Sequence, residues 1–428
     1  MTAAPRTTFD AVIVGAGLAG STAAIQLARA GWSVALVERQ RFPRRKVCGE
    51  CIAASNLPLL QALGIGEAFD AQAGPELRQV TLLQGDRAVT ADLPAAEHEG
   101  FAWGRALGRE TLDSWLLQQA RAAGASVFQP WSVQAILGRA GAWQCELRAL
   151  ESAARVRLSA TLVIDAHGSW EDLVTDRPKR RLARSASDLF AFKATFKGAS
   201  VPAGAIGVLA LDGGYGGMVL ADGGTTTVAC CIRRDRLSAL RSAAPGLRAG
   251  AVVEAWLLAE CAGVRRALQG ASRDGSWLTS GPLDPGVRLA ASDTIFRIGN
   301  AAGEAHPILG EGMSMALQSA ALLCSLLLDP AGATAPTASA QAELQRRYAA
   351  AWRRQFAPRL RLAAVFAHLA MRPRSASALV TLAQAWPGLL TRGARWGGKV
   401  RLVGGATPAA TRAALQTRPV PPGALPTR

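Results

Sequence analysis

The stretch from Phe9 to Glu38, FDAVIVGAGLAGSTAAIQLARAGWSVALVE, decides the fold of this chain. It opens on an apolar run that ends at Gly15 and closes on a second apolar run that ends at Glu38. Short continuous apolar runs of this kind are typical of buried parallel strands. Between them, residues 21–30 place small and apolar side chains at helical spacing until Gly31 ends the helix. The stretch therefore predicts a βαβ unit, which is the building block of a doubly wound α/β domain.

The turn between the first strand and the helix carries Gly15, Gly17 and Gly20. Gly15 permits a tight turn, Gly17 lets a pyrophosphate approach the backbone, and Gly20 lets the helix pack closely on the strand. The helix N-terminus adds unpaired N–H groups and a partial positive charge. Glu38 can accept hydrogen bonds from ribose hydroxyls, and we assign the following Arg39 to the same site. This pattern predicts a dinucleotide site.

Two later segments complete the motif set: RALGRETLD at residues 105–113 and RIGNAAGEAHPILGEGMSMA at residues 297–316. The second segment resembles the second flavin motif of the FAD-binding superfamily of aromatic hydroxylases, geranylgeranyl reductases and flavin halogenases. That motif is a strand, then Gly-Asp-Ala-Ala, then Pro and a Gly-x-Gly that opens a long helix. The resemblance spans about residues 9–330 and implies that the cofactor is FAD.

The resemblance also assigns individual residues to the cofactor. It implies that Gly299 and Asn300 lie along the ribityl chain, and that residues 310–312 lie under the isoalloxazine at a helix N-terminus. Such a terminus stabilises the negative charge of reduced flavin. Asn300 stands where the family usually has Asp, and its amide can still bind a ribityl hydroxyl while one negative charge is lost. The cofactor contacts expected in these two segments are Arg109, Gly299, Asn300, Pro307, Gly310 and Gly312.

The segment PRRKVCGEC at residues 43–51 resembles a Pro-Arg-x-Lys-x-Cys-Gly segment of the geranylgeranyl reductase-like branch. By that resemblance it borders the flavin and the substrate, with Lys46 meeting phosphate or the flavin edge. Cys48 is a catalytic candidate that shapes or protonates substrate, or it is a small buried side chain. A redox pair of Cys48 with Cys51 is a further reading. No second nucleotide loop supports that pair, and no second cysteine pair supports a zinc site.

His306, inside the flavin motif, is the second catalytic candidate. Beside the ring it can act as a general acid or base, or it can hold the backbone as a supporting histidine. Tyr215, in the Gly-rich run at residues 213–217, either touches substrate or packs in the core. The other three histidines are expected to be turn, surface or packing residues: His98, His167 and His368.

The rest of the sequence predicts how other parts surround the βαβ unit. Residues 188–235 alternate in polarity between Gly-rich turns, which predicts an antiparallel sheet. We expect an α/β fold: a doubly wound, Rossmann-like FAD domain with an inserted antiparallel substrate domain and C-terminal helices. The expected boundaries are 1–180 and 286–338 for the FAD domain, 181–285 with part of 52–100 for the substrate domain, 339–403 for the helices, and 404–428 for a disordered tail. The helices are expected to break at Pro358, Pro373 and Pro387.

Charge is unevenly distributed along the chain. The net charge is +17, and residues 340–428 hold fifteen Arg or Lys against one acid, Glu343. Aromatic residues are interleaved with these cations, which predicts peripheral contact with an anionic membrane for residues 386–402 and a solvated face for residues 340–371. No nucleic-acid motif accompanies the charge, so nucleic acid is not an expected partner. No targeting segment or membrane span is found, which predicts a cytoplasmic location, with contact at the inner face of the membrane.

The resemblance leaves the reaction open. The leading expectation is a monooxygenase of secondary metabolism that uses NAD(P)H and O2 to hydroxylate a small lipophilic, aromatic or polyketide-like substrate. The alternative is reduction of a C=C bond, with a proton from Cys48, His306 or water. A protein that binds FAD without catalysis, or a thiol relay, is the alternative of another class. The Trp-x-Trp-x-Ile-Pro segment of flavin halogenases is not found; Phe101-Ala-Trp103 is the nearest aromatic pair.

Overall fold

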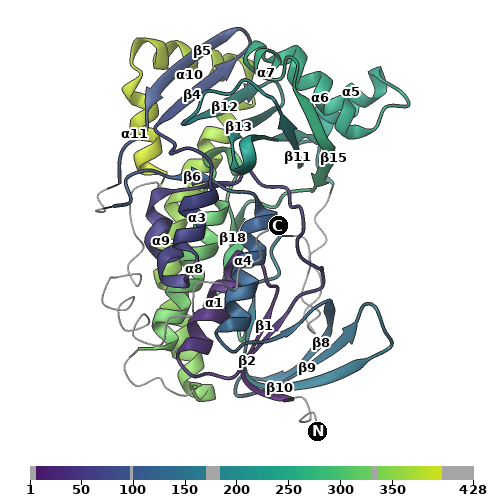
Figure 1. Ribbon diagram of the computed structural model, residues 1–428, viewed down its shortest axis with the longest axis vertical. Helices are drawn as coiled ribbons and strands as arrows, with labels where there is room; N and C mark the ends of the chain where they lie inside the picture. The colour runs from purple at the N-terminus through teal and green to yellow at the C-terminus, as the bar shows by residue number, and fades with distance from the viewer. Residues whose placement is uncertain (1–5, 97–99, 170–183, 330–334, 398–428) are drawn as a thin grey trace.

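The computed structural model describes residues 6–96, 100–169, 184–329 and 335–397. Figure 1 shows two sheets, one near each end of the molecule, with helices α1, α4, α8 and α9 running between them. The expected tail at residues 404–428 and His98 lie outside the described residues, as do residues 97–99 and 170–183 near the expected domain boundaries.

The first sheet confirms the doubly wound fold predicted from Phe9–Glu38. Its central strands run in the order β7-β2-β1-β10, all parallel, and β17 adds to β10. Strand β10 then continues antiparallel into a β9–β8 hairpin, which the sequence analysis did not predict. The bounds are β1 (Thr8–Val14), β2 (Val34–Val37), β7 (Ser126–Phe128), β8 (Trp131–Arg139), β9 (Ala142–Ala149), β10 (Arg155–Asp165) and β17 (Phe296–Arg297).

Three helices share the main hydrophobic core with this sheet: α1 (Leu18–Arg29), α4 (Arg109–Ala122) and α8 (Gly312–Leu327). Helix α1 packs against both of the others, and its Ala23 and Ala24 are fully buried. Small side chains at these positions let the helix axes approach closely. This packing fixes the N-termini of α1 and α8 beside the same space.

The second sheet has the order β15-β11-β14-β13-β12-β4-β5 and is antiparallel except where β4 pairs parallel with β12. One face of this sheet is covered by α5 (Arg234–Ala243), α6 (Ala249–Glu260) and α7 (Ala262–Ala267). The opposite face is directed toward the first sheet. The bounds are β4 (Gln79–Gln84), β5 (Arg87–Asp92), β11 (Leu189–Lys197), β12 (Ala205–Leu211), β13 (Gly214–Leu220), β14 (Thr225–Arg233) and β15 (Ser272–Ser280).

Short elements connect the two sheets. They comprise β3 (Cys51–Ile52), β6 (Arg105–Ala106), β16 (Gly286–Val287), β18 (Gly303–Glu304), α2 (Leu57–Leu63), α3 (Gly66–Gln72), and the 3-10 turns η1 (Ala54–Asn56), η2 (Asp222–Gly224), η3 (Gly299–Ala301) and η4 (Pro307–Leu309). Strand β3 pairs with β6, and β16 pairs with β18.

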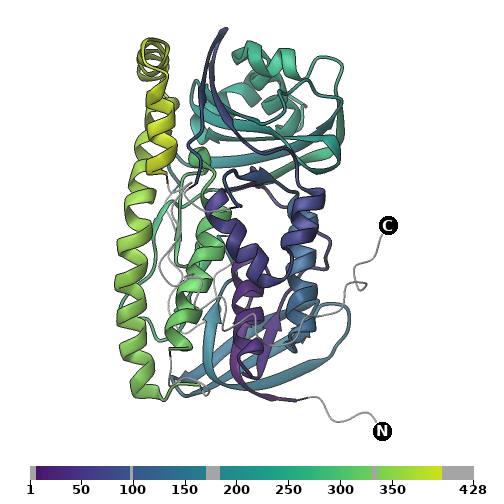
Figure 2. The same cartoon turned by 60° about the vertical axis from the view of Figure 1, so that its left-hand side comes forward.

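The C-terminal helices are α9 (Ala338–Ala370), α10 (Pro373–Ala385) and α11 (Gly388–Trp396). Helix α9 runs along one side of the molecule from the first sheet to the second (Figure 2). The predicted break at Pro358 is wrong, because Pro358 lies inside α9. The buried Trp352, Phe356 and Leu360 on either side of it hold one apolar face against the core, and this packing outweighs the lost hydrogen bond. Pro373 begins α10, and Pro387 precedes α11, as expected.

Candidate active site

A cavity of about 220 Å³ lies where the two sheets face each other. Its walls come from the α1 N-terminus, the loop at residues 46–51, the start of α8, and strands β12, β13 and β14 of the second sheet. Segments that are far apart in the sequence thus meet at one site. Most of the sequence-predicted site residues line it: Gly17, Lys46, Cys48, Arg109, Gly299, Asn300, Pro307, Gly310 and Gly312.

The glycines of the first turn have the geometry that a phosphate-binding loop needs. Gly15 has a φ of +100°, and a Cβ there would lie 2.6 Å from the carbonyl oxygen of Ala166. A Cβ on Gly20 would lie 1.8 Å from the carbonyl oxygen of Gly15. Gly17 caps helix α1 without any side-chain hydrogen bond to its first turn. The first N–H groups of α1 are therefore available to an anion.

Three cations gather around this helix N-terminus. The Nη2 atoms of Arg44 and Arg109 lie 3.6 and 3.9 Å from the Cβ position of Gly17, and Lys46 Nζ lies 3.5 Å from that of Gly168. The Arg44 Nε atom is buried and has no hydrogen-bond partner among the described residues. Burial, and next the charges of Arg109 and Arg44, lower the pKa of Lys46 to about 8. A pyrophosphate fits this cluster, since it would relieve the repulsion and satisfy the buried guanidinium.

Two carboxylates hold the cluster in place. Asp113 accepts two hydrogen bonds from Arg109, at 2.8 Å from Nε and 2.9 Å from Nη2, and lies 3.4 Å from Arg44. Glu38 is buried and accepts from the backbone N–H groups of Ala16 at 3.0 Å and Gln40 at 2.8 Å. Its carboxylate thus lies beside the phosphate-binding loop, where the ribose next to the pyrophosphate of a bound dinucleotide would lie. Arg39 is exposed beyond β2 and is not among the cavity-lining residues.

The second flavin motif forms the opposite wall. Asn300 Nδ2 donates to Ser169 Oγ at 2.7 Å, and Ser169 Oγ donates to Glu304 Oε1 at 2.8 Å. Gly299 has a φ of +61°, and a Cβ there would lie 3.0 Å from the Cβ of Ala19. The chain at Asn300 therefore passes directly beside α1. This wall is polar and offers amide, hydroxyl and carboxylate groups to a polyol such as the ribityl chain.

The start of α8 is open toward the cavity. Gly310 is left-handed with a φ of +65°, and α8 begins at Gly312 with no side-chain cap. In the described part of the chain, nothing beyond the residues next to Gly312 lies within 4 Å of a Cβ built on it. A flat ring system can therefore lie against backbone N–H groups there, as the resemblance implied for the isoalloxazine. The residues present fit FAD at its phosphate, ribityl and ring ends.

Cys48 and Cys51 both line the cavity. Cys48 is half-buried, its Sγ accepts from the Glu50 N–H at 3.4 Å, and it lines the same cavity as Arg109. Cys51 is buried, and its thiol donates to the Gly49 carbonyl at 3.4 Å. Neither cysteine forms a disulfide with another described cysteine. Among the described residues, no group of three or more His, Cys, Asp or Glu side chains is placed to hold a metal ion.

Glu50 connects the two domains, and sequence reasoning missed it. Its Oε1 binds Lys193 Nζ of β11 and accepts from the Arg109 N–H at 2.9 Å, while Oε2 accepts from Thr227 Oγ1 at 2.6 Å. Glu50 and Lys193 are both buried, and Glu50 has a φ of +60°, rare outside glycine. The only sequence signal was a lysine in the otherwise apolar strand LFAFKATFK at residues 189–197.

His306 lies behind the cavity wall rather than in it. Its Nδ1 is 3.2 Å from the hydroxyl oxygen of Tyr215, which lines the cavity. Burial, and next the charge of His368, lower the pKa of His306 to about 4. His368, expected to be a surface or packing residue, is exposed and also contacts the His306 ring at a centroid distance of 5.7 Å. His167 pairs with Asp165.

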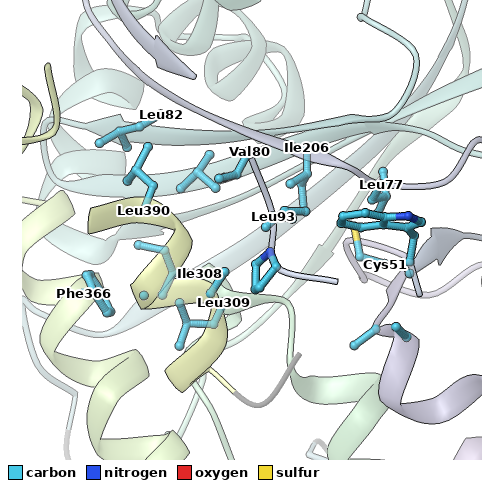
Figure 3. Close-up of a pocket in the computed structure, with 18 of the residues that line it drawn as sticks. Cys51, Leu77, Val80, Leu82, Leu93, Ile206, Ile308, Leu309, Phe366 and Leu390 are labelled. Carbon is cyan, nitrogen blue, oxygen red and sulfur yellow. The ribbon is translucent and has the colours of Figure 1, made fainter. Parts of the chain in front are cut away.

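A second cavity of about 140 Å³ adjoins the first. In Figure 3, Val80, Leu82 and Ile206 of the sheet lie across it from Phe366 and Leu390 of the C-terminal helices, with Cys51 toward one end. The lining is almost wholly apolar. The two cavities share four wall residues: Cys51, Ile206, Val208 and Ile308.

A family model described as an FAD binding domain matches residues 8–201. The chain carries an FAD binding domain. This match supports the predicted cofactor, FAD. The matched range contains the Gly15–Gly20 loop, the Cys48 segment and Arg109, and it ends inside the second sheet.

Curated relatives match this flavoprotein over short segments. It is 45% identical to menaquinone reductase of Mycolicibacterium smegmatis over 64 residues, which is 15% of this chain and 16% of the relative. It is 35% identical to tryptophan 2-halogenase of Chondromyces crocatus over 118 residues, which is 28% of this chain and 22% of the relative. These matches span less than a third of either relative.

Solved structures match over nearly the whole length. The myxobacterial chondrochloren halogenase aligns with 96% of this chain and 97% of its own, at a TM-score of 0.69 and 19% identity. A geranylgeranyl bacteriochlorophyll reductase-like protein from Thermoplasma acidophilum aligns with 96% and 97%, at a TM-score of 0.67 and 16% identity. At this identity the likeness establishes the fold of the flavoprotein, including its second sheet and C-terminal helices.

Proposed function

We propose that this flavoprotein is a monooxygenase that uses NAD(P)H and O2 to hydroxylate an elongated lipophilic substrate with an aromatic head. The two adjoining cavities carry the proposal. The first offers polar walls and open backbone at its cofactor side, while the second is apolar and shares the wall residues Cys51, Ile206, Val208 and Ile308 with the first. An aromatic head in the first cavity and an aliphatic tail in the second would use both environments.

Bound FAD would supply the redox chemistry by passing electrons from NAD(P)H to O2 or to the substrate. The protein binds and orients. Arg44, Lys46 and Arg109 would hold the pyrophosphate, Glu38 the ribose, and the backbone at the start of α8 the ring. The apolar second cavity would exclude water from the substrate tail and fix the head against the ring.

Turnover in air tests the proposal. Phenols with linear alkyl chains of increasing length are supplied with NADPH, and NADPH oxidation, O2 consumption and product mass are followed. We expect substrate-stimulated NADPH oxidation that consumes O2, and a product heavier by one oxygen atom. Turnover that continues at the same rate without O2 would overturn hydroxylation.

Reduction of a C=C bond is the second candidate. It is favoured by the thiol of Cys48 in the cavity wall beside Arg109, and by the 45% identity to menaquinone reductase over 64 residues. This reaction needs a proton donor and no oxygen. A polyprenyl quinone incubated with NADPH under nitrogen would then gain two hydrogen atoms, and Cys48→Ala would lower the rate if the thiol gives the proton.

Two non-redox or thiol-based alternatives have distinct outcomes. A flavin that neither NADH, NADPH nor dithionite can reduce would identify an FAD-binding protein without redox activity. A thiol relay would require Cys48 and Cys51 together. Activity that survives the Cys48→Ala and Cys51→Ala double substitution would exclude that relay.

We further propose that the substrate is met at an anionic membrane surface. Helix α11 turns Leu389, Leu390 and Ala394 toward the apolar cavity and leaves Arg392, Arg395 and Trp396 exposed on its other side. Trp386 is 46% exposed with the Arg392 guanidinium stacked 4.4 Å from its ring centroid, and Trp396 is 65% exposed. Aromatic and basic side chains together are typical of interfacial helices. None of the described helices is long and apolar enough to cross a membrane.

A further inference from the structure

We propose that Glu311 and Arg359 form a buried ion pair that sets the reduction potential of the bound flavin. Glu311 directly precedes the first residue of α8, and Arg359 lies in α9. Arg359 Nη1 lies 3.5 Å from Oε2 of Glu311, and the two residues are 9% and 0% exposed. The inference rests on one part of the proposed function, the placement of the flavin ring at the start of α8. It holds for hydroxylation and for C=C reduction alike.

Glu311 lies between two residues of the cavity wall but is directed away from the cavity. Gly310 and Gly312 are among the described residues that line the cavity, and Glu311 is not. Its side chain makes no capping hydrogen bond to the first turn of α8. The carboxylate is directed instead toward α9, which packs beside α8 (Figure 2). The backbone on which the ring would lie thus has a buried negative charge directly behind it.

A buried hydrogen-bond network holds Arg359 in place. Its Nη1 donates to Gln318 Oε1 at 2.9 Å, and Gln318 Nε2 donates to Asn56 Oδ1 at 3.0 Å. Asn56 Nδ2 donates in turn to Ser314 Oγ at 2.8 Å. The three partners are buried, two of them in α8 and one in η1. The guanidinium is therefore fixed relative to the start of α8.

Arg359 also stays charged in this position. Its Cζ lies 5.4 Å from the centroid of the Phe356 ring, which is fully buried in the main core. A guanidinium keeps its proton in proteins and stacks favourably on an aromatic face. Replacing a buried ion pair by apolar side chains often costs no stability. A gain in stability is therefore not a sufficient reason for this pair, and a role at the adjacent site has to be considered.

The two charges act on the flavin in opposite directions. Reduction adds negative charge to the ring, and the N-terminus of α8 favours that charge. The positive charge of Arg359 also favours it, while the negative charge of Glu311 opposes it. Such effects are strong here because both groups are shielded from water. The pair thus leaves the field of the helix N-terminus nearly undisturbed, and the loss of either partner would disturb it.

This opposition separates the proposal from a purely structural role. If the pair only held α8 against α9, removing either partner would lower the free energy of unfolding, and any change in potential would have no fixed sign. If the pair sets the potential, Glu311→Gln must raise it and Arg359→Gln must lower it. Stability and potential then respond differently to the same two substitutions.

The test measures the midpoint potential of the FAD-loaded, full-length protein at pH 7 by anaerobic equilibration with reference dyes. Glu311→Gln should raise the ratio of the Kd for oxidised FAD to that for reduced FAD by about tenfold, the order expected for one buried charge. For a two-electron couple, tenfold corresponds to a rise of about 30 mV. Arg359→Gln should shift the potential downward, and the double substitution should return it close to the wild-type value.

Two further variants control the test. Arg359→Lys keeps the positive charge and should keep the wild-type potential, even where it lowers the free energy of unfolding. Arg361→Gln removes an exposed arginine of the same helix and should change neither quantity. Glu311→Gln is decisive by itself, because the amide keeps the volume of the carboxylate. A potential that this variant leaves unchanged or lowers overturns the proposal, and so does a rise with Arg359→Gln.

The potentials need neither a substrate nor oxygen, so the result is independent of the proposed reaction. If no phenol is hydroxylated but the two substitutions shift the potential in opposite directions, the role of the pair stands and the proposed reaction fails. If phenols are hydroxylated and Glu311→Gln leaves the potential unchanged, the reaction stands and the role of the pair fails.

Discussion

Lys46 shows how one residue reports on the cofactor site. Its pKa, lowered to about 8, means that the side chain loses its charge within an accessible pH range. FAD binding should therefore weaken as pH rises through 8, since the neutral amine no longer attracts pyrophosphate. Lys46→Gln should bind FAD more weakly at pH 7, by about tenfold, and should flatten the dependence of Kd on pH between 7 and 9.

Flavin-fluorescence titrations of the apoprotein from pH 6 to pH 10 would measure this dependence. Lys197→Gln is the control, because Lys197 is exposed at the end of β11. A wild-type Kd that stays constant across pH 8 would contradict the placement of Lys46 at the phosphates.

His306 predicts a stability change in acid. Its pKa is about 4 in the folded protein against 6.5 for the ordinary side chain, so the unfolded chain binds the proton more tightly. The free energy of unfolding should fall as pH drops from about 6.5 toward 4, by up to roughly 3 kcal/mol from this group. His306→Gln should remove this part of the pH dependence of the free energy of unfolding, measured in urea between pH 6.5 and 4. Arg361→Gln, which replaces an exposed residue of α9, is the control and should keep the steeper dependence.

Single residues differ in how far the sequence could identify them. Gly15, Gly17 and Gly20 were predictable because their conformations and close approaches arise within one local turn. Glu50 and Lys193 were not, because they are 143 positions apart and meet only when the sheets come together. His368 was correctly expected at the surface or in packing, but its contact with the His306 ring was not predictable, because nothing local links the two residues.

At the scale of elements, β12 separates the two cavities. Val208 of β12 lines both of them, so Val208→Phe should fill space at the wall that the two cavities share. Each methylene kept out of the apolar cavity forfeits about 0.8 kcal/mol, so KM should rise more than tenfold for every two methylenes excluded. The readout is KM against alkyl chain length, and a short-chain phenol with unchanged KM is the internal control. Equal effects on short and long chains would refute the tail site.

Elements with a strong local period were predicted, and those defined by tertiary packing were not. The βαβ unit and the helix that begins at Gly312 follow from apolar spacing and glycine positions. The β8–β9 hairpin was not predicted, because strand pairing decides it, and the break expected at Pro358 was wrong, because core burial holds α9 together there. A proline predicts the end of a helix only where no buried face holds the helix together.

At the scale of the whole molecule, the exposed edge formed by α10 and α11 should bind anionic vesicles. Replacing both Trp386 and Trp396 by Ser should lower sedimentation with phosphatidylglycerol vesicles several-fold, and added salt should weaken wild-type binding. Leu247→Ser is the control, because Leu247 is also exposed, at 52%, but lies in the second domain away from these helices. Equal binding to neutral vesicles at high salt would exclude the electrostatic contribution.

Helix α9 constrains how the active site can be reached. Its 33 residues are about 50 Å long, and it places Trp352 and Phe356 in the main core while Ala367 and Ala370 lie in the core beneath the second sheet. One helix is thus packed into the hydrophobic cores of both halves of the molecule. A hinge motion that separated the two sheets would have to expose one set of these buried side chains to water. The free-energy cost would be about 1.5–3 kcal/mol for each large side chain exposed. Substrates must therefore enter through openings between side chains at the protein surface. The width of those openings, rather than a separation of the two halves, sets which molecules the protein can accept.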